Sequence, residues 1–75
     1  MERYRNINGD SGVYEYEFGN DYIRVQFSTS AQYIYTYQSA GVDNIEHMKI
    51  LAVRGSGLNA FINKVVRNRY ARKER

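Results

Sequence analysis

The spacing of apolar side chains changes about halfway along the chain, from every second residue to every third or fourth. Apolar and polar residues alternate over residues 13–18, 22–27 and 32–38, and turn-forming residues separate the three runs. Alternation places successive side chains on opposite faces, as in a half-buried β-strand. The short turn at residues 19–21 indicates a β-hairpin, so the three runs together predict an antiparallel meander.

Each predicted strand has one apolar or aromatic face. These faces carry, strand by strand, Tyr14, Tyr16 and Phe18; Ile23, Val25 and Phe27; and Tyr33, Tyr35 and Tyr37. The opposite face of the third strand is polar, which favours a core role for its tyrosine row. The alternative is a surface on which nucleic-acid bases stack, with Tyr35 or Tyr37 as the stacking ring.

Helical spacing follows the predicted strands. Asp43 and Glu46 are typical of a capping box, and Gly55 suits the left-handed position that closes a helix. The apolar residues between them predict an amphipathic helix over residues 44–53.

A second helix is predicted to begin at Ser56, which can act as its cap, and to extend into the basic tail as far as Tyr70. Its apolar side carries Leu58, Phe61, Ile62 and Val65. Its polar side carries Asn59, Asn63, Lys64 and Arg67.

These elements predict an α+β fold, in which a three-stranded antiparallel meander is followed by two C-terminal helices packed on one sheet face. Residues 1–12 form an N-terminal arm or a short extra edge strand. Residues 13–71 form a single α+β domain, and residues 72–75 form a basic C-terminal tail.

Positive charge is concentrated at the C-terminus. Residues 67–75 contain five cations and one anion, a net charge of +4, whereas the whole chain carries 11 cations and 8 anions, a net of +3. Subtraction leaves six cations and seven anions in residues 1–66, a net of −1. A local cluster of cations favours a phosphate-bearing partner. The alternative is a basic helix end that complements the helix dipole.

The junction between the predicted helices has the composition of an anion site. Free amides at a helix N-terminus bind phosphate, and glycines let a ligand approach the backbone. The candidate anion-binding residues are Arg54, Ser56, Gly57, Leu58 and Asn59. The candidate basic surface consists of Lys49, Lys64, Arg67, Arg69 and Arg72. A plain helix–turn–helix corner, with Gly55 at positive φ and Ser56 as cap, explains the junction equally well.

Composition argues against several other classes. The chain has no cysteine and a single histidine, His47, so we expect no metal site and no cofactor. Glu15 and Glu17 have the spacing of exposed carboxylates on a strand, and we expect no catalysis. No apolar run has the length of a membrane span, and no apolar stretch follows the charged N-terminus, so we expect a cytoplasmic location. Without a disulfide or metal, homo-oligomerisation is one way to bury more apolar surface.

Residues 48–63 contain the pattern Met-Lys-x-Leu-Ala-x-x-Gly-x-Gly-Leu-Asn-x-Phe-Ile-Asn, which resembles the KTSC domain family. The residues Val-Gln-Phe at 25–27, the tyrosine alternation and Tyr70 fit the same pattern, so that the resemblance covers residues 11–71. It implies a small domain, found in bacteria and phages and as an appendix to enzymes such as lysyl-tRNA synthetases. It makes Gly55, Gly57, Asn59 and Asn63 signature positions. Arg54 stands where the family more often has lysine.

The sequence favours a non-catalytic binding module for a phosphate-bearing partner, either nucleic acid or a nucleotide. One alternative is a phage-encoded protein that binds and modulates a host protein complex, because tyrosine and arginine are favoured at protein interfaces. A second alternative is a sponge that sequesters a signalling nucleotide.

Overall fold

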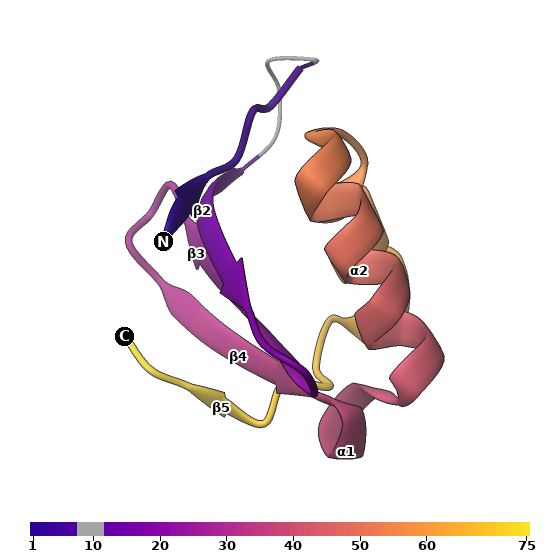
Figure 1. Ribbon diagram of the computed structural model, residues 1–75. Helices are drawn as coiled ribbons and strands as arrows, with labels where there is room; N and C mark the ends of the chain where they lie inside the picture. Colours follow the sequence, from indigo (N-terminus) through magenta and orange to yellow (C-terminus); the bar gives the residue numbers. More distant parts are fainter. Residues whose placement is uncertain (8–11) are drawn as a thin grey trace.

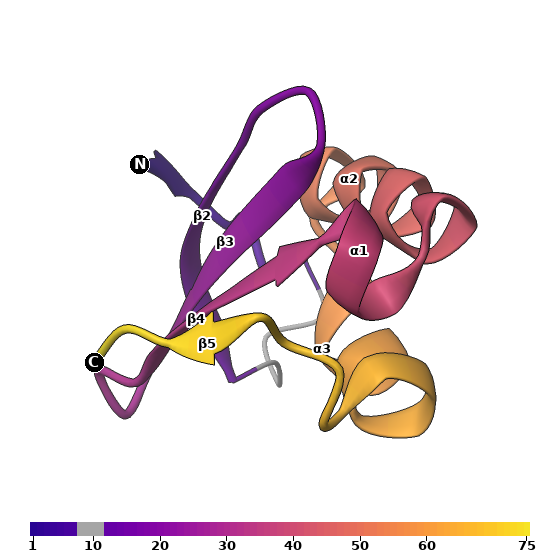
Figure 2. The same cartoon turned by 90° about the horizontal axis from the view of Figure 1, so that it is seen from below.

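The computed structural model describes residues 1–7 and 12–75 and has an α+β fold (Figure 1). Among these residues the strands are β1 (Glu2–Arg3), β2 (Val13–Phe18), β3 (Tyr22–Phe27), β4 (Gln32–Thr36) and β5 (Arg72–Lys73). They form one open antiparallel sheet in the order β1-β2-β3-β4-β5. The helices lie on one side of this sheet (Figure 2). The predicted fold class is confirmed, with more strands and helical segments than expected.

The three central strands match the alternation in the sequence, with one irregularity in β2. Val13 pairs with Phe27 and Glu15 pairs with Gln26, which leaves Tyr14 as the extra residue of a β-bulge. The bulge shifts the face on which the following side chains lie. The prediction that Tyr14 shares one face with Tyr16 is therefore wrong, because Tyr14 is 40% exposed whereas Tyr16 is buried.

The sheet has an additional edge strand at each end. The N-terminal strand β1 agrees with the short extra edge strand, which was one of the two alternatives for residues 1–12. The C-terminal strand β5 corrects the prediction of a continuous helix into the tail. The Ala71 amide donates to the carbonyl of Ile34 at 2.7 Å, and the Glu74 amide donates to the carbonyl of Gln32 at 2.6 Å. These bonds satisfy the β4 edge, which a helical tail would leave unpaired.

Two helices follow β4. The short helix α1 (Tyr37–Ala40) takes the last residues that were predicted as strand, because Thr36 and Ser39 form a capping box there. The long helix α2 (Val42–Arg54) begins after Gly41, whose N-cap position has no side-chain hydrogen bond. The predicted capping box at Asp43 is therefore wrong. The C-terminal end is confirmed, because Gly55 is left-handed with φ 83°.

The last helical stretch is shorter than predicted. Helix α3 (Leu58–Phe61) continues into the π-helix η1 (Ile62–Val66), and Gly57 rather than Ser56 occupies the N-cap. The wider π turn and a bond from the Arg69 amide to the Val66 carbonyl, 2.8 Å long, end the helix and turn the chain back toward the sheet.

The core lies between the helices and the inner face of the sheet. The sheet contributes Tyr16, Ile23, Val25 and Tyr35 to it, all nearly or fully buried. The helices contribute Ile45, Met48, Leu51, Leu58, Ile62 and Val66. The apolar stripe predicted for α2 is therefore confirmed, and so is the packing of the helices on one sheet face.

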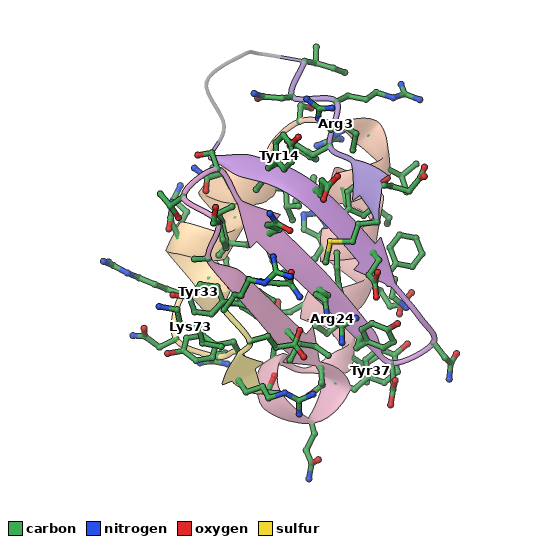
Figure 3. All side chains as sticks on the ribbon, turned by 90° about the vertical axis from the view of Figure 1, so that its left-hand side faces the viewer. Arg3, Tyr14, Arg24, Tyr33, Tyr37 and Lys73 are labelled. Atoms are coloured by element: carbon green, nitrogen blue, oxygen red, sulfur yellow. The ribbon has the colours of Figure 1, made fainter. Side chains whose placement is uncertain are left out.

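The outer face of the sheet carries a network of paired charges (Figure 3). Arg24 on β3 pairs with Glu17 and, at 2.5 Å, with Glu74. Glu74 also accepts hydrogen bonds from Gln32 at 3.2 Å and from Arg72 at 3.1 Å. Chiefly because Arg24 donates to it, the pKa of Glu74 is lowered to about 2. We call this surface the open face.

Candidate functional site

The N-terminal segment covers the corner that was predicted to bind an anion. The Leu58 amide, at the start of α3, donates to the hydroxyl of Tyr4 at 3.3 Å, and both residues are buried. The Ile7 amide donates to the Gly55 carbonyl at 2.9 Å. An anion cradle that uses the Leu58 amide is therefore not formed, because a protein hydroxyl occupies that donor.

The other corner residues do not converge on one point either. Gly57 is left-handed, and Ser56 makes no side-chain cap to α3. Arg54 is exposed at the end of α2, with no ion pair among the described residues. Asn59 lies in a different place, where it lines a pocket.

The predicted basic surface divides into paired and unpaired cations. Lys49 pairs with Glu46 at 2.8 Å and donates to the carbonyl of Asn20, which leaves its side chain only 14% exposed. Arg72 pairs with Glu74 on the open face. The other predicted cations, Lys64, Arg67 and Arg69, are exposed and form no ion pair within the described part of the chain.

Neither predicted stacking ring is on a free surface. Tyr35 is 2% exposed, and its burial raises the pKa of its hydroxyl. Tyr37 lies in α1, where its hydroxyl donates to Glu46 at 2.5 Å and where that bond raises the pKa of the hydroxyl. The Lys49 ammonium lies 5.6 Å from the Tyr37 ring centre. The stacking role assigned to Tyr35 is therefore wrong, whereas Tyr37 is only partly buried and its stacking role stays a prediction.

A pocket of about 390 Å³ opens between the β3–β4 loop and the stretch from α3 to Tyr70. Its volume falls within the ~300–1,000 Å³ range of sites for small ligands. It is lined by Gly12, Phe27, Ser28, Thr29, Ala31, Tyr33, Tyr35, Asn59, Ile62, Asn63, Arg67, Asn68 and Tyr70. We call these residues the aromatic–amide pocket.

Aromatic rings form one wall of the aromatic–amide pocket. The Tyr33 and Tyr70 rings lie 4.7 Å apart between centroids, and Phe27 meets Tyr33 edge to face at 5.8 Å. The Tyr35 ring meets the Tyr70 ring edge to face, with 6.4 Å between the ring centroids. Tyr70 remains 37% exposed, so a flat ligand can reach it. This wall can bind the face of an aromatic ligand.

Amide side chains and one cation form a second wall, on the stretch from α3 to residue 68. Asn59 and Asn63 lie four residues apart on α3 and η1, and Asn68 follows in the next turn. No hydrogen bond to these three side chains is found among residues 1–7 and 12–75. Each amide can donate and accept, so together they can bind the polar edge of a planar ligand. Arg67 completes this wall with its guanidinium, which suits a phosphate.

Sequence reasoning singled out residues of the second wall without predicting a pocket. Asn59, Asn63 and Arg67 were expected on the polar side of one helix, and the structure has all three lining one pocket, with Arg67 just beyond the end of η1. Tyr33 and Tyr70 were not assigned together to a site, because their contact depends on the reversal of the chain that leads into β5. The signal available was the excess of tyrosines over other aromatic residues, which gives no position.

The part of the chain that the structure describes contains no group of three or more His, Cys, Asp or Glu side chains arranged to hold a metal ion. None of its helices combines the length and the apolar character needed to cross a bilayer. Glu17, one of the two strand carboxylates, is bonded to Arg24.

Comparison with known proteins gives no relative for this chain. No protein-family model, no curated protein and no solved structure matches it. The resemblance to the KTSC family therefore stays a prediction.

Proposed function

We propose that this protein is a non-catalytic binding module for a phosphate-bearing ligand that also carries a planar ring, namely single-stranded nucleic acid or a nucleotide. The observation that supports this proposal is the aromatic–amide pocket, where Tyr70, three asparagines and Arg67 surround one cavity. In this proposal the base enters the cavity and the phosphate remains at its mouth.

Each wall has a distinct role in the proposed complex. The ring of Tyr70, supported by Tyr33, stacks on the base, an interaction that tolerates any base sequence. The amides of Asn59 and Asn63 bind the edge of the base, which in a single strand is not occupied by a complementary strand. A duplex keeps its bases stacked, so we expect the pocket to prefer single strands.

The phosphate is bound by Arg67, with Lys64 and Arg69 nearby on the same stretch of chain. Three cations within six residues, with no ion pair to any described residue, repel one another in the free protein. A polyanion removes that repulsion and releases its own counterions on binding. This release makes the affinity depend steeply on salt concentration.

The experiment is a fluorescence-anisotropy titration of labelled single-stranded RNA and DNA at several salt concentrations. With three phosphate contacts, the slope of log K against log salt is expected to be about −2. The Arg67→Gln variant should bind about 10-fold more weakly and with a shallower slope. The matched control is Arg3→Gln, because Arg3 lies on β1, over the ring of Tyr14, and outside the pocket (Figure 3).

A calorimetric titration with mononucleotides separates a nucleotide site from a nucleic-acid site. Binding of a mononucleotide alone would restrict the ligand to nucleotides. If neither oligonucleotides nor mononucleotides bind at low salt, or if Arg3→Gln weakens binding as much as Arg67→Gln, the proposal is wrong.

A further inference from the structure

Helix α2 carries a second apolar stripe that faces away from the core. Its buried stripe includes Ile45 and Met48, whereas Val42, Ile50 and Val53 are exposed to between 52% and 60%. Residues 42, 46, 50 and 53 are spaced by four, four and three, so they lie on one side of the helix. This outer stripe makes no contribution to the core of the chain.

The side chains of the outer stripe are also unfavourable for a solvated helix. Val42, Ile50 and Val53 are β-branched, and each lowers helix stability relative to an unbranched or charged residue. Neither helix propensity nor packing against residues 1–7 and 12–75 accounts for them. An apolar partner surface does account for them.

The outer stripe continues onto the sheet. Phe18, at the end of β2, is exposed and lies beside Ile50 and Val53, and the three residues line a hollow of about 490 Å³. The other lining residues are Glu46, Lys49 and Arg54. We call these six residues, with Val42, the α2 patch.

Two oppositely charged side chains of the α2 patch can each form a further hydrogen bond or ion pair. Glu46 accepts hydrogen bonds from Tyr37 and Lys49 through Oε2 alone, so its Oε1 accepts none from the described residues. Arg54 makes no ion pair with any residue in positions 1–7 or 12–75. Glu46 lies four residues before Ile50 and Arg54 lies four residues after it.

We infer that the α2 patch binds a second copy of this chain, with the two α2 helices antiparallel and crossing at Ile50. In such a two-fold arrangement, the residue four before the crossing faces the residue four after it in the other helix. Glu46 of each copy therefore meets Arg54 of the other, which gives two identical ion pairs. Ile50 packs against its own counterpart between them, and Phe18 and Val53 cover its sides.

The complementarity of Glu46 and Arg54 is what selects a second copy as the occupant. A parallel arrangement would place Glu46 beside Glu46 and Arg54 beside Arg54, which repel. The aromatic–amide pocket and the α2 patch have no lining residue in common. The dimer would therefore carry two separate copies of the proposed ligand site, and the inference does not depend on the proposed function.

The test is sedimentation equilibrium over a range of protein concentrations. The mass should rise from 8.8 kDa toward twice that value as the concentration increases. Ile50→Asp should raise the dimer dissociation constant at least about 10-fold. Glu46→Arg and Arg54→Glu should each also weaken the dimer, because each places like charges opposite one another.

Mixing the two charge variants tests the antiparallel arrangement. The Glu46→Arg chain has two cations and the Arg54→Glu chain has two anions at these positions, so an equimolar mixture should form a heterodimer in which both ion pairs are restored. Lys64→Glu is the matched control for Arg54→Glu, because it also replaces a cation by an anion but lies outside the α2 patch. It should leave the dimer intact. Circular dichroism of each variant verifies that it is folded.

Three results would overturn the inference. The first is a wild-type chain that remains monomeric at protein concentrations up to ~1 mM, because we expect a dimer dissociation constant below that value. The second is a dimer that folded Ile50→Asp leaves unchanged, which would place the interface elsewhere. The third is a mixture of the two charge variants that does not associate more strongly than either variant alone.

Discussion

Arginine side chains lie both on the open face of the sheet and beside the aromatic–amide pocket, but the two regions differ in whether these side chains form ion pairs. On the open face, Arg24 and Arg72 share the carboxylate of Glu74. Arg67, which lines the pocket, and Arg69, two residues later, have no acidic partner in the described part of the chain. Arg72 of the first group and Arg69 of the second are close in the sequence, because only residues 70 and 71 separate them.

The difference shows that a run of basic residues is not one surface. The chain reverses after Tyr70, so its last residues join the sheet, where Arg72 and Glu74 are paired on the open face. The residues before the reversal stay at the end of η1, where their charges repel one another. Pairing thus separates cations that hold the structure together from cations that remain available to a ligand.

The largest expected effect comes from reversal of the unpaired group. Changing Lys64, Arg67 and Arg69 together to Glu should weaken oligonucleotide binding by at least about 100-fold, because attraction to phosphate becomes repulsion. The thermal stability should not fall, since no ion pair among the described residues is lost. Fluorescence anisotropy and a thermal melt measure the two quantities. Retained affinity would mean that these cations do not contact the ligand.

The converse change is made on the open face. Arg24→Gln removes the partner of Glu17 and Glu74, and we expect it to lower the free energy of unfolding by about 2 kcal/mol because both carboxylates are partly buried. Oligonucleotide affinity should stay within roughly twofold of the wild type, a difference of about 0.4 kcal/mol. Urea unfolding measures the first effect and anisotropy the second. Equal losses in both would erase the distinction between the two regions.

A smaller effect is expected at the corner between α2 and α3. Tyr4→Phe removes the acceptor of the Leu58 amide and should lower stability by about 1 kcal/mol, since a buried donor is left unpaired. Its affinity for oligonucleotides should match the wild type. An increase in affinity for inorganic phosphate would instead show that the unpaired Leu58 amide is an anion site that the Tyr4 hydroxyl normally occupies.

The smallest effect depends on pH. The pKa of Glu74 in the folded protein is lowered to about 2, below its ordinary value in an unfolded chain. Its stabilisation is therefore fully present above that ordinary value and is lost as the pH falls through about 2. Glu74→Gln should cost under about 1 kcal/mol at pH 7 and almost nothing near pH 2, as urea unfolding at each pH would measure. A cost that is independent of pH would contradict the Arg24–Glu74 pairing.

The sequence predicted the parts of the fold that depend on local periodicity. The strands at 13–18 and 22–27, the core stripe of α2 and the closing glycine Gly55 all follow from spacing and backbone preference. The C-terminal edge strand could not be predicted in this way. Its formation depends on the free edge of β4 and on the contact of Glu74 with Arg24, fifty residues away in the sequence.

The candidate site was predictable only on its helical side. Asn59, Asn63 and Arg67 share a helix face, so their spacing brings them together. The sequence assigned Leu58 to the anion-binding corner, but its amide donates to the hydroxyl of Tyr4. The two residues are 54 positions apart, so no local pattern could have predicted this hydrogen bond. Alternation alone made Tyr35 a stacking candidate. In the structure Tyr35 is buried, and Tyr70 is the ring of the pocket that is exposed.

The most direct measurement is a two-dimensional ¹H–¹⁵N NMR titration with a short single-stranded RNA at low salt. We predict that the amide signals of Asn59, Asn63, Arg67 and Tyr70 shift together with a common affinity, while those of Arg24 and Gln32 on the open face do not move. Shifts centred on the open face, or no shifts at any RNA concentration, would contradict the assignment of the aromatic–amide pocket as the ligand site.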